Sequence, residues 1–205
     1  MAGDRKQQRA AVGVLEHGNS AILITIAPGG ELLDRRRVDL TSGLPTHPYH
    51  HEGSWAVGRY LNSSWARKIS FPDAVALVDR VREAAGRGAR ESLEALAATV
   101  TVPIGRIAIR VCPRLPATTE ERIADTRAAN VADSVMYREA LATAAQARGW
   151  YVHWYDRDRV FREATATLGR GDIDDFLRTM GRSIGPPWQA RHKLAAAAAI
   201  AAMRA

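Results

Sequence analysis

The amino-acid sequence predicts an α/β domain, and two observations carry that prediction. Three strand-like apolar segments follow one another near the start, before any helical pattern. The later strand-like segments then alternate with helical ones, in the order β-β-β-α-β-α-β-α. A length of 205 residues fits one domain that buries a substantial core. We therefore expect residues 1–205 to form a single domain of five strands flanked by helices.

The first three strands are expected within residues 11–40. The apolar run Val12–Leu15 ends at Glu16 and a Gly-containing turn, and the β-branched run Ala21–Ile26 follows. Pro28-Gly29-Gly30 predicts a tight turn, because glycine tolerates a positive φ. The third segment alternates apolar with charged side chains, namely Leu32, Val38 and Leu40 with Arg35, Arg37 and Asp39. Short turns between consecutive strands predict an antiparallel meander.

Helices and two further strands are expected in the rest of the chain. Proline at the start and Gly86 beyond the end predict a helix over Pro72–Ala85. A capping sequence and Gly149 predict a long helix over Thr118–Arg148, with Val131, Val135, Ala142 and Ala145 in one stripe. The remaining expected elements are a helical continuation at Ala89–Ala98, strands Arg106–Cys112 and Trp150–Tyr155, and helices at Arg159–Leu168, at Asp172–Met180 and from Pro187.

Composition bears on the compartment. The single cysteine, Cys112, excludes an internal disulfide framework, fits a reducing cytoplasm and is expected to be buried and inert. No stretch reaches the roughly 20 apolar residues of a membrane span. The basic residues 1–9 are not followed by the apolar region of a signal peptide. We expect a cytoplasmic protein without membrane association.

The charge of the chain indicates an anionic partner. Its net charge is +7 and its isoelectric point is near 10.2, values that favour nucleic acid. An acidic protein partner would satisfy the same positive surface. Nearly all the cations are arginine, since Lys6, Lys68 and Lys193 are the only lysines. A GC-rich genome also produces such a skew, so charge alone leaves the partner open.

Three segments resemble one known fold family. Val12–Ser20 is an apolar run followed by an acid and a Gly-containing turn; Ile107–Arg110 is a strand in fourth position; Trp188–Leu194 opens an alanine-rich helix. Together with the element order, they resemble the ribonuclease H-like superfamily, and within it the Holliday-junction resolvases. The resemblance implies a five-stranded mixed sheet, a two-metal nuclease site of three or four carboxylates, and a possible homodimer.

The sequence departs from that family at the expected catalytic positions. Glu16 keeps an acid after the first strand, Arg110 stands where the second acid is expected, and His192 and Gln189 stand in the last helix. A cation at position 110 would repel a metal, and one Glu with one His would bind Mg²⁺ weakly. The resemblance therefore implies a degenerate catalytic site at Glu16, Arg110 and His192. Their alternative roles are a solvated strand-end carboxylate, an exposed or ion-paired arginine and an exposed helix residue.

The irregular segment, residues 41–68, contains a second group of candidate side chains. His47, His50, His51 and Glu52 lie within six positions, and together with Glu16 they could bind Zn²⁺ or Mn²⁺. They could equally act as general acid and base. Their spacing matches no standard metal motif, so a polar loop with one capping histidine is an open alternative.

Aromatic and basic residues interleave immediately afterwards. Aromatic rings stack on exposed bases while cations follow phosphates, which suits single-stranded or distorted nucleic acid. The residues concerned are Trp55, Arg59, Tyr60, Trp65, Arg67 and Lys68. The alternative is that the rings pack this segment onto the sheet.

These observations support three hypotheses. The first is a nucleic-acid-binding protein that lacks the standard two-metal activity. The second is a metal-dependent hydrolase or nuclease, using Mg²⁺, Mn²⁺ or Zn²⁺ bound by Glu16 and the histidine group, with His192 completing the site. It requires residues 41–68 to fold back over the end of the first strand. The third is a non-catalytic protein-interaction domain.

Overall fold

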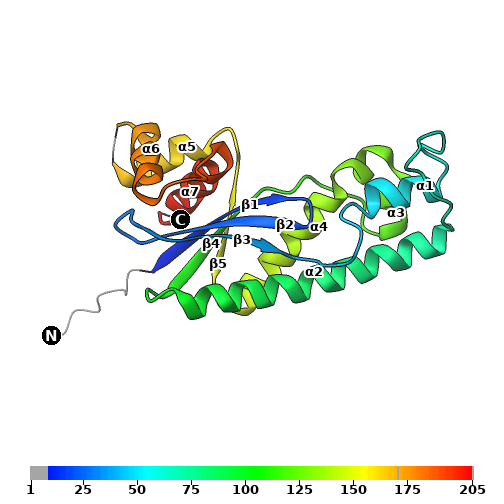
Figure 1. The fold of residues 1–205 in the computed structure, drawn as a ribbon, viewed down its shortest axis with the longest axis horizontal. Coiled ribbons are helices and arrows are strands. Elements are labelled where there is room, and N and C mark those ends of the chain that lie inside the picture. The colour runs from blue at the N-terminus through cyan, green and yellow to red at the C-terminus, as the bar shows by residue number, and fades with distance from the viewer. Residues whose placement is uncertain (1–8, 170, 205) are drawn as a thin grey trace.

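The computed structural model describes residues 9–169 and 171–204 and contains one five-stranded sheet in the order β3-β2-β1-β4-β5 (Figure 1). The strands are β1 (Ala10–His17), β2 (Ser20–Ile26), β3 (Leu32–Asp39), β4 (Ile104–Arg110) and β5 (Tyr151–Tyr155). As predicted, β1, β2 and β3 form an antiparallel meander. The strands β4 and β5 run parallel to β1, so the sheet is mixed.

Helices cover both faces of the sheet (Figure 1). One face packs against α2 (Phe71–Thr99) and α4 (Thr126–Ala147), and the other against α7 (Ala190–Ala202). The shorter helices α5 (Val160–Leu168) and α6 (Ile173–Ile184) pack beside α7. Within the described part of the chain, no helix is both long and apolar enough to cross a membrane.

The alanine-rich helix α7 is buried because it lies unusually close to β1. Its residues 195–202 are at most 5% exposed. A Cβ added at Gly13 would lie 1.7 Å from the Ala195 carbonyl oxygen, so only glycine allows this approach. Side chains of β1 alternate between the layers, with Val12 and Val14 facing α2 and α4, and Leu15 facing α7. This alternation decides where the candidate site residues lie.

The prediction that Gly86 ends the first helix was wrong. Helix α2 continues for 29 residues from its Ser70 cap, and its buried side chains run from Ala74 to Leu96 on both sides of Gly86. Nearby, Gly88 sits against Leu40, where a Cβ would lie 2.2 Å from the carbonyl oxygen. The glycine at 88 serves close packing, and burial along the whole face outweighs the modest cost of glycine within a helix.

The long helix predicted over Thr118–Arg148 is two helices. The Thr118 capping box opens a short helix, α3 (Thr119–Ala124), as predicted. Asp125 then adopts an extended conformation, and its side chain accepts hydrogen bonds from the backbone N–H groups of Arg127 and Ala128 to cap α4. Val131 is 38% exposed and does not share the buried stripe of Val135, because the break sets the orientation of α4.

The segment predicted to be irregular contains two short helical turns. They are η1 (Tyr49–Gly53), with π-type hydrogen bonds, and α1 (Ser54–Ala56). The segment contacts the β1–β2 turn, because a Cβ added at Gly18 would lie 2.7 Å from the Thr46 side chain. Residues 41–53 thus fold back towards the end of β1.

Candidate nucleic-acid interface

Glu16 forms a buried ion pair at the end of β1. Its Oε1 accepts hydrogen bonds from Nε (2.7 Å) and Nη2 of Arg138 on α4. The side chains of Glu16 and Arg138 are only 6% and 8% exposed. Arg138 also donates a hydrogen bond of 3.0 Å to the Val111 carbonyl, beyond the end of β4. Glu16 is therefore not a solvated strand-end carboxylate, and its charge is neutralised by this arginine.

Arg110 and His192 lie on the other face of the sheet, beside α7. His192 is 6% exposed, so the alternative of an exposed helix residue was wrong. Its Nδ1 accepts from the Gln189 backbone N–H at 3.0 Å, and its ring stacks on Trp188 at 5.8 Å. Burial, followed by the charges of Arg35 and Arg191, lowers the pKa of His192. The structure thus does not bring Glu16 together with Arg110 and His192.

An arginine-lined groove opens at the start of α7. It consists of two pockets of about 330 and 470 Å³ that share Leu15 and Arg191. We call it the arginine groove, and the charged and histidine side chains that line it are His17, Arg35, Arg36, Arg37, Arg110, Arg157, Asp158, Arg191 and His192. Asp158 is the one carboxylate among these lining residues. The groove therefore carries a strong excess of positive charge.

The arginines of this groove differ in how far they are committed to internal contacts. Arg35 donates to the carbonyls of Gly185 (3.0 Å) and Pro187 (2.8 Å), so it also positions the segment before α7. Arg37 is highly exposed, at 3.5 Å from Asp39. Within the described residues, the side chains of Arg110 and Arg157 form no hydrogen bond or ion pair. These two guanidinium groups remain available for an anion.

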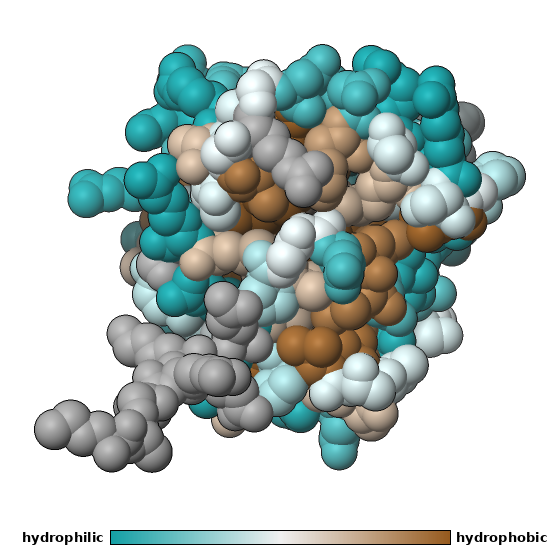
Figure 2. All heavy atoms as spheres, turned by 90° about the vertical axis from the view of Figure 1, so that its left-hand side faces the viewer, coloured by the Kyte–Doolittle hydropathy of each residue, from teal (hydrophilic) through white to brown (hydrophobic). Residues whose placement is uncertain are grey.

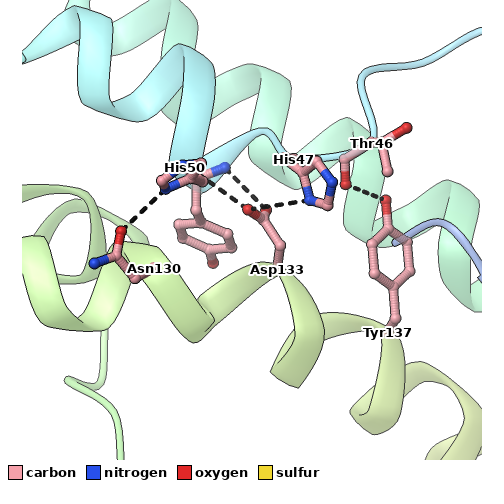
Figure 3. Close-up of polar contacts among 7 residues, drawn as sticks. Thr46, His47, His50, Asn130, Asp133 and Tyr137 are labelled. Atoms are coloured by element: carbon pink, nitrogen blue, oxygen red, sulfur yellow. Dashed lines mark hydrogen bonds and ion pairs between the residues drawn. The ribbon is translucent and has the colours of Figure 1, made fainter. Parts of the chain in front are cut away.

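A second region, the histidine cluster, consists of His47, His50 and His51 and lies beside the β1–β2 turn, where a Cβ added at Gly18 would lie 3.6 Å from the His47 ring. Figure 3 shows the polar contacts of His47 and His50. The rings of His47 and His50 lie 5.4 and 5.3 Å from that of His51. His50 Nδ1 lies 3.0 Å from Asn130 Oδ1 on α4. Burial lowers the pKa of His47 and of His51, and the neighbouring histidines lower both further. Both shifts favour the neutral imidazoles of His47 and His51.

The buried carboxyl group of Asp133 anchors this cluster, and sequence reasoning missed it. It accepts hydrogen bonds from the backbone N–H groups of Tyr49 (3.0 Å) and His50 (3.1 Å), and it lies 3.9 Å from His47 Nδ1 (Figure 3). Burial raises the pKa of Asp133 to about 7. The available signal was an acid on the buried face of a helix, one turn before Tyr137, where such a residue needs partners.

The aromatic and basic segment is only partly accessible. Trp55 is 8% exposed and packs under the surface. Arg59 donates to the carbonyls of Ile123 (2.9 Å) and Ala124, at the end of α3. Burial therefore encloses Trp55, and the guanidinium group of Arg59 caps α3. Tyr60, Trp65, Arg67 and Lys68 are exposed.

Comparison with known proteins identifies the fold. No family model matches the chain, and no curated protein matches it. A solved structure, Thermus thermophilus RuvC in complex with a Holliday-junction substrate, matches 94% of this chain and 91% of its own, with a TM-score of 0.50 and 15% sequence identity. The chain has the ribonuclease H-like fold. A second structure of Thermus thermophilus RuvC has 16% identity and a TM-score of 0.46, over 94% of this chain and 92% of its own.

The ribonuclease H-like fold implies divalent metals, and the residues present do not fit them. On the α7 face, the ends of β1 and β4 present Leu15 and Arg110, and α7 begins with His192. Mg²⁺ prefers carboxylate oxygens, and an arginine repels it. Across residues 9–169 and 171–204, no three His, Cys, Asp or Glu side chains are grouped to hold a metal. That finding covers the predicted ligands Glu16, His47, His50, His51 and Glu52.

A larger hollow of about 1010 Å³ lies at the opposite end of the sheet, lined by residues including Pro28, Tyr151 and Leu168. Figure 2 views this end and shows apolar side chains exposed among polar ones. Two of its three lining arginines, Arg106 and Arg204, donate hydrogen bonds within the molecule. Arg106 donates to the carbonyls of Ala202 and Met203, and Arg204 to that of Ala166. Residues 1–8, which include most of the basic start, lie outside the described part of the chain.

Proposed function

We propose that this protein binds nucleic acid through the arginine groove, and that it does so without the paired metal ions of a two-metal nuclease. The observation that carries the proposal is that a positive side chain, Arg110, replaces the expected negative one at the end of β4. Arg110 lies where the resemblance implies a metal-binding acid, and Arg157 and Arg191 line the same pocket. Guanidinium groups bind phosphate oxygens in a bidentate geometry.

The surroundings of the groove support phosphate binding rather than catalysis. Glu16, which follows the groove residue Leu15 on β1, is neutralised by Arg138 on the other face of the sheet. The buried His192 already uses Nδ1 to accept a backbone hydrogen bond. The metal-dependent hydrolase has less support, because its five predicted ligands do not converge. An acidic protein partner would meet the same positive groove and is distinguished by the experiment below.

Binding of labelled four-way-junction, duplex and single-stranded DNA, and of single-stranded RNA, tests the proposal. We expect affinity to fall linearly with salt on a logarithmic plot, since each neutralised phosphate releases counterions. Replacing Arg110 and Arg157 by Gln should reduce the slope by about 1 for each phosphate that is no longer neutralised. Arg87→Gln is the control, because Arg87 is an exposed arginine on α2 outside the groove.

Two results would contradict the proposal. One is the absence of salt-dependent binding to every nucleic acid. The other is an equal loss of affinity in Arg87→Gln and in the groove variants. Cleavage is assayed in parallel with EDTA, Mg²⁺ and Mn²⁺, and metal-dependent cutting would overturn the statement that the protein acts without paired metals.

A further inference from the structure

Helix α1 lies at the far end of the molecule from α6 (Figure 1), and the segment that follows it carries an exposed apolar patch. Tyr60 is 41% exposed, Trp65 44% and Leu61 54%. Together with Val57, these residues account for four of the eight large exposed hydrophobic side chains in the described part of the chain. They come from one short segment, residues 57–65. An apolar patch gathered in this way indicates a binding surface.

The two exposed rings rest on a layer of buried or half-buried rings. Trp65 lies 5.5 Å from Trp55 and 5.0 Å from His51, while Tyr60 lies 5.8 Å from His50. The ring centroids of Tyr60 and Trp65 are 5.8 Å apart. We call Tyr60 and Trp65 the aromatic platform. Rigid rings of this kind add contact area to a complex at little conformational-entropy cost.

Contacts with two helices, α4 and α3, fix the layer beneath the platform. Asp133 on α4 accepts two backbone hydrogen bonds from η1, and Asn130 contacts His50. Arg59 joins the neighbouring turn to the end of α3. The platform is therefore preorganised, which reduces the ordering cost when a ligand binds.

The backbone at Tyr60 is strained in a way that core packing does not require. Its φ is +58°, in the left-handed region that a non-glycine residue with a bulky side chain rarely adopts. The ring it carries is exposed, so the strain holds an aromatic side chain at the surface rather than in the core. Strained residues of this kind cluster at ligand-binding sites.

The charge around the platform favours an anionic ligand. Arg67 and Lys68 lie just after Trp65 in the sequence and are exposed. Burial raises the pKa of Glu52, and the charge of Arg67 partly offsets that rise. The β1–β2 turn connects the platform region to the arginine groove. His17 lines the groove, and the neighbouring Gly18 lies against His47 of the cluster. An anion held in the groove can thus extend towards the aromatic rings.

We propose that Tyr60 and Trp65 stack on unpaired bases of the nucleic acid that the arginine groove binds. The inference rests on the proposed function and names its substrate class as single-stranded or branched nucleic acid. A duplex keeps its bases stacked on one another, whereas unpaired bases present both faces to aromatic side chains. The platform therefore supplies preference for unpaired regions, and the groove supplies phosphate contacts to all forms.

Binding by Trp65→Ala and Tyr60→Ala to a single-stranded oligonucleotide, a four-way junction with an unpaired centre and a matched duplex tests this inference. We expect each variant to lose about 5-fold to 100-fold in affinity for the single strand. Duplex affinity and its salt slope should stay as in the wild type. Trp65→Phe should restore most of the single-strand affinity, because it retains a ring.

The control is Trp154→Ala, which removes a tryptophan of similar exposure (41%) on β5. Thermal unfolding of every variant shows whether it is folded. In the wild type, the tryptophan fluorescence should be quenched by the single strand, and Trp65→Ala should lose most of that quenching.

The possible failures are distinguishable. If the wild type binds no nucleic acid, both proposals fail. If it binds, but Trp65→Ala lowers the affinity for single strand and duplex equally, only the platform proposal fails. The same holds if Trp65→Ala lowers neither affinity. Sedimentation velocity addresses the competing occupant, a second copy of this chain. A dimer that becomes monomeric in Trp65→Ala with unchanged binding would also overturn the platform proposal.

Discussion

At the scale of single residues, the buried pair of Glu16 and Arg138 joins three parts of the structure. It ties the end of β1 to α4, and Arg138 also holds the carbonyl of Val111. Tyr155 adds a further contact to β1, because its hydroxyl donates a hydrogen bond of 3.0 Å to the Val14 carbonyl. These side chains satisfy polar groups where β1 and β4 no longer pair beyond Gly13 and Ala108.

Replacing Arg138 by Met should destabilise the protein by about 3–5 kcal/mol, because it leaves the Glu16 carboxylate buried without a counter-charge. Adding Glu16→Gln should recover part of that loss. Urea unfolding measures both, with Arg178→Met as the control, since the exposed Arg178–Asp175 pair contributes at most about 1 kcal/mol. An Arg138→Met protein as stable as the control would show that Glu16 finds another partner.

Asp133 should make stability depend on pH below neutrality. Burial raises its pKa from 3.8 to about 7, so the folded protein keeps a proton that the unfolded chain releases. The contribution of Asp133 to the unfolding free energy should therefore fall as pH rises from about 4 to about 7, by no more than about 4 kcal/mol, and level off above that. Asp133→Asn should flatten this dependence in urea unfolding series at several pH values. The lowered pKa values of His47, His51 and His192 contribute with the opposite sign, so the difference between wild type and variant isolates Asp133.

The matched control for that experiment is Asp174→Asn, because Asp174 is an exposed carboxylate in the first turn of α6. It should keep the pH dependence of the wild type. The interpretation of Asp133 is wrong if its Asn variant retains the same slope between acidic and neutral pH.

At the scale of elements, the contact between β1 and α7 positions the arginine groove. Gly13 faces Ala195 and Ala199 so closely that the backbones of β1 and α7 approach each other with almost no side chain between them. Leu15, two residues along β1, then lines both pockets of the groove. Spacing of the helix from the sheet thus sets the spacing of Arg110 and Arg191.

Gly13→Ala should destabilise the protein by about 1–3 kcal/mol or more, because the added methyl group overlaps the Ala195 carbonyl and forces α7 away from β1. Thermal unfolding measures the loss. Gly29→Ala serves as the control, since a Cβ there would meet nothing within 4 Å. Equal stability of the two variants would contradict the close packing described for β1 and α7.

At the scale of the whole molecule, the groove and the platform lie at separate places joined by the β1–β2 turn. Because they share no residue, their contributions to the free energy of binding should add. We expect the variant combining Arg110→Gln with Trp65→Ala to lose, for a single strand, the product of the two separate fold-losses. A combined loss no larger than the greater single one would indicate that the two sites do not act on one strand. The homodimer and an acidic protein partner stay predictions.

Local sequence signals determined the order of elements. The apolar runs of β1 and β2, the alternation in β3, the Thr118 capping box and the alanine run of α7 are patterns of neighbouring residues. Such patterns are visible in a single sequence. The positive charge and the inversion at Arg110 were likewise visible, and with them the expectation of nucleic acid and an altered metal site.

Only the tertiary structure decided which side chains meet. It placed Glu16 and Arg110 on opposite faces of the sheet, because adjacent strand positions alternate and register is set by packing across the sheet. It paired Glu16 with Arg138, 122 positions away, and Tyr49 beside the histidine cluster with Asp133, 84 positions away. It also buried Trp55 and exposed Trp65 within one aromatic segment. Such choices depend on burial and long-range contacts, which no local pattern of residue types encodes.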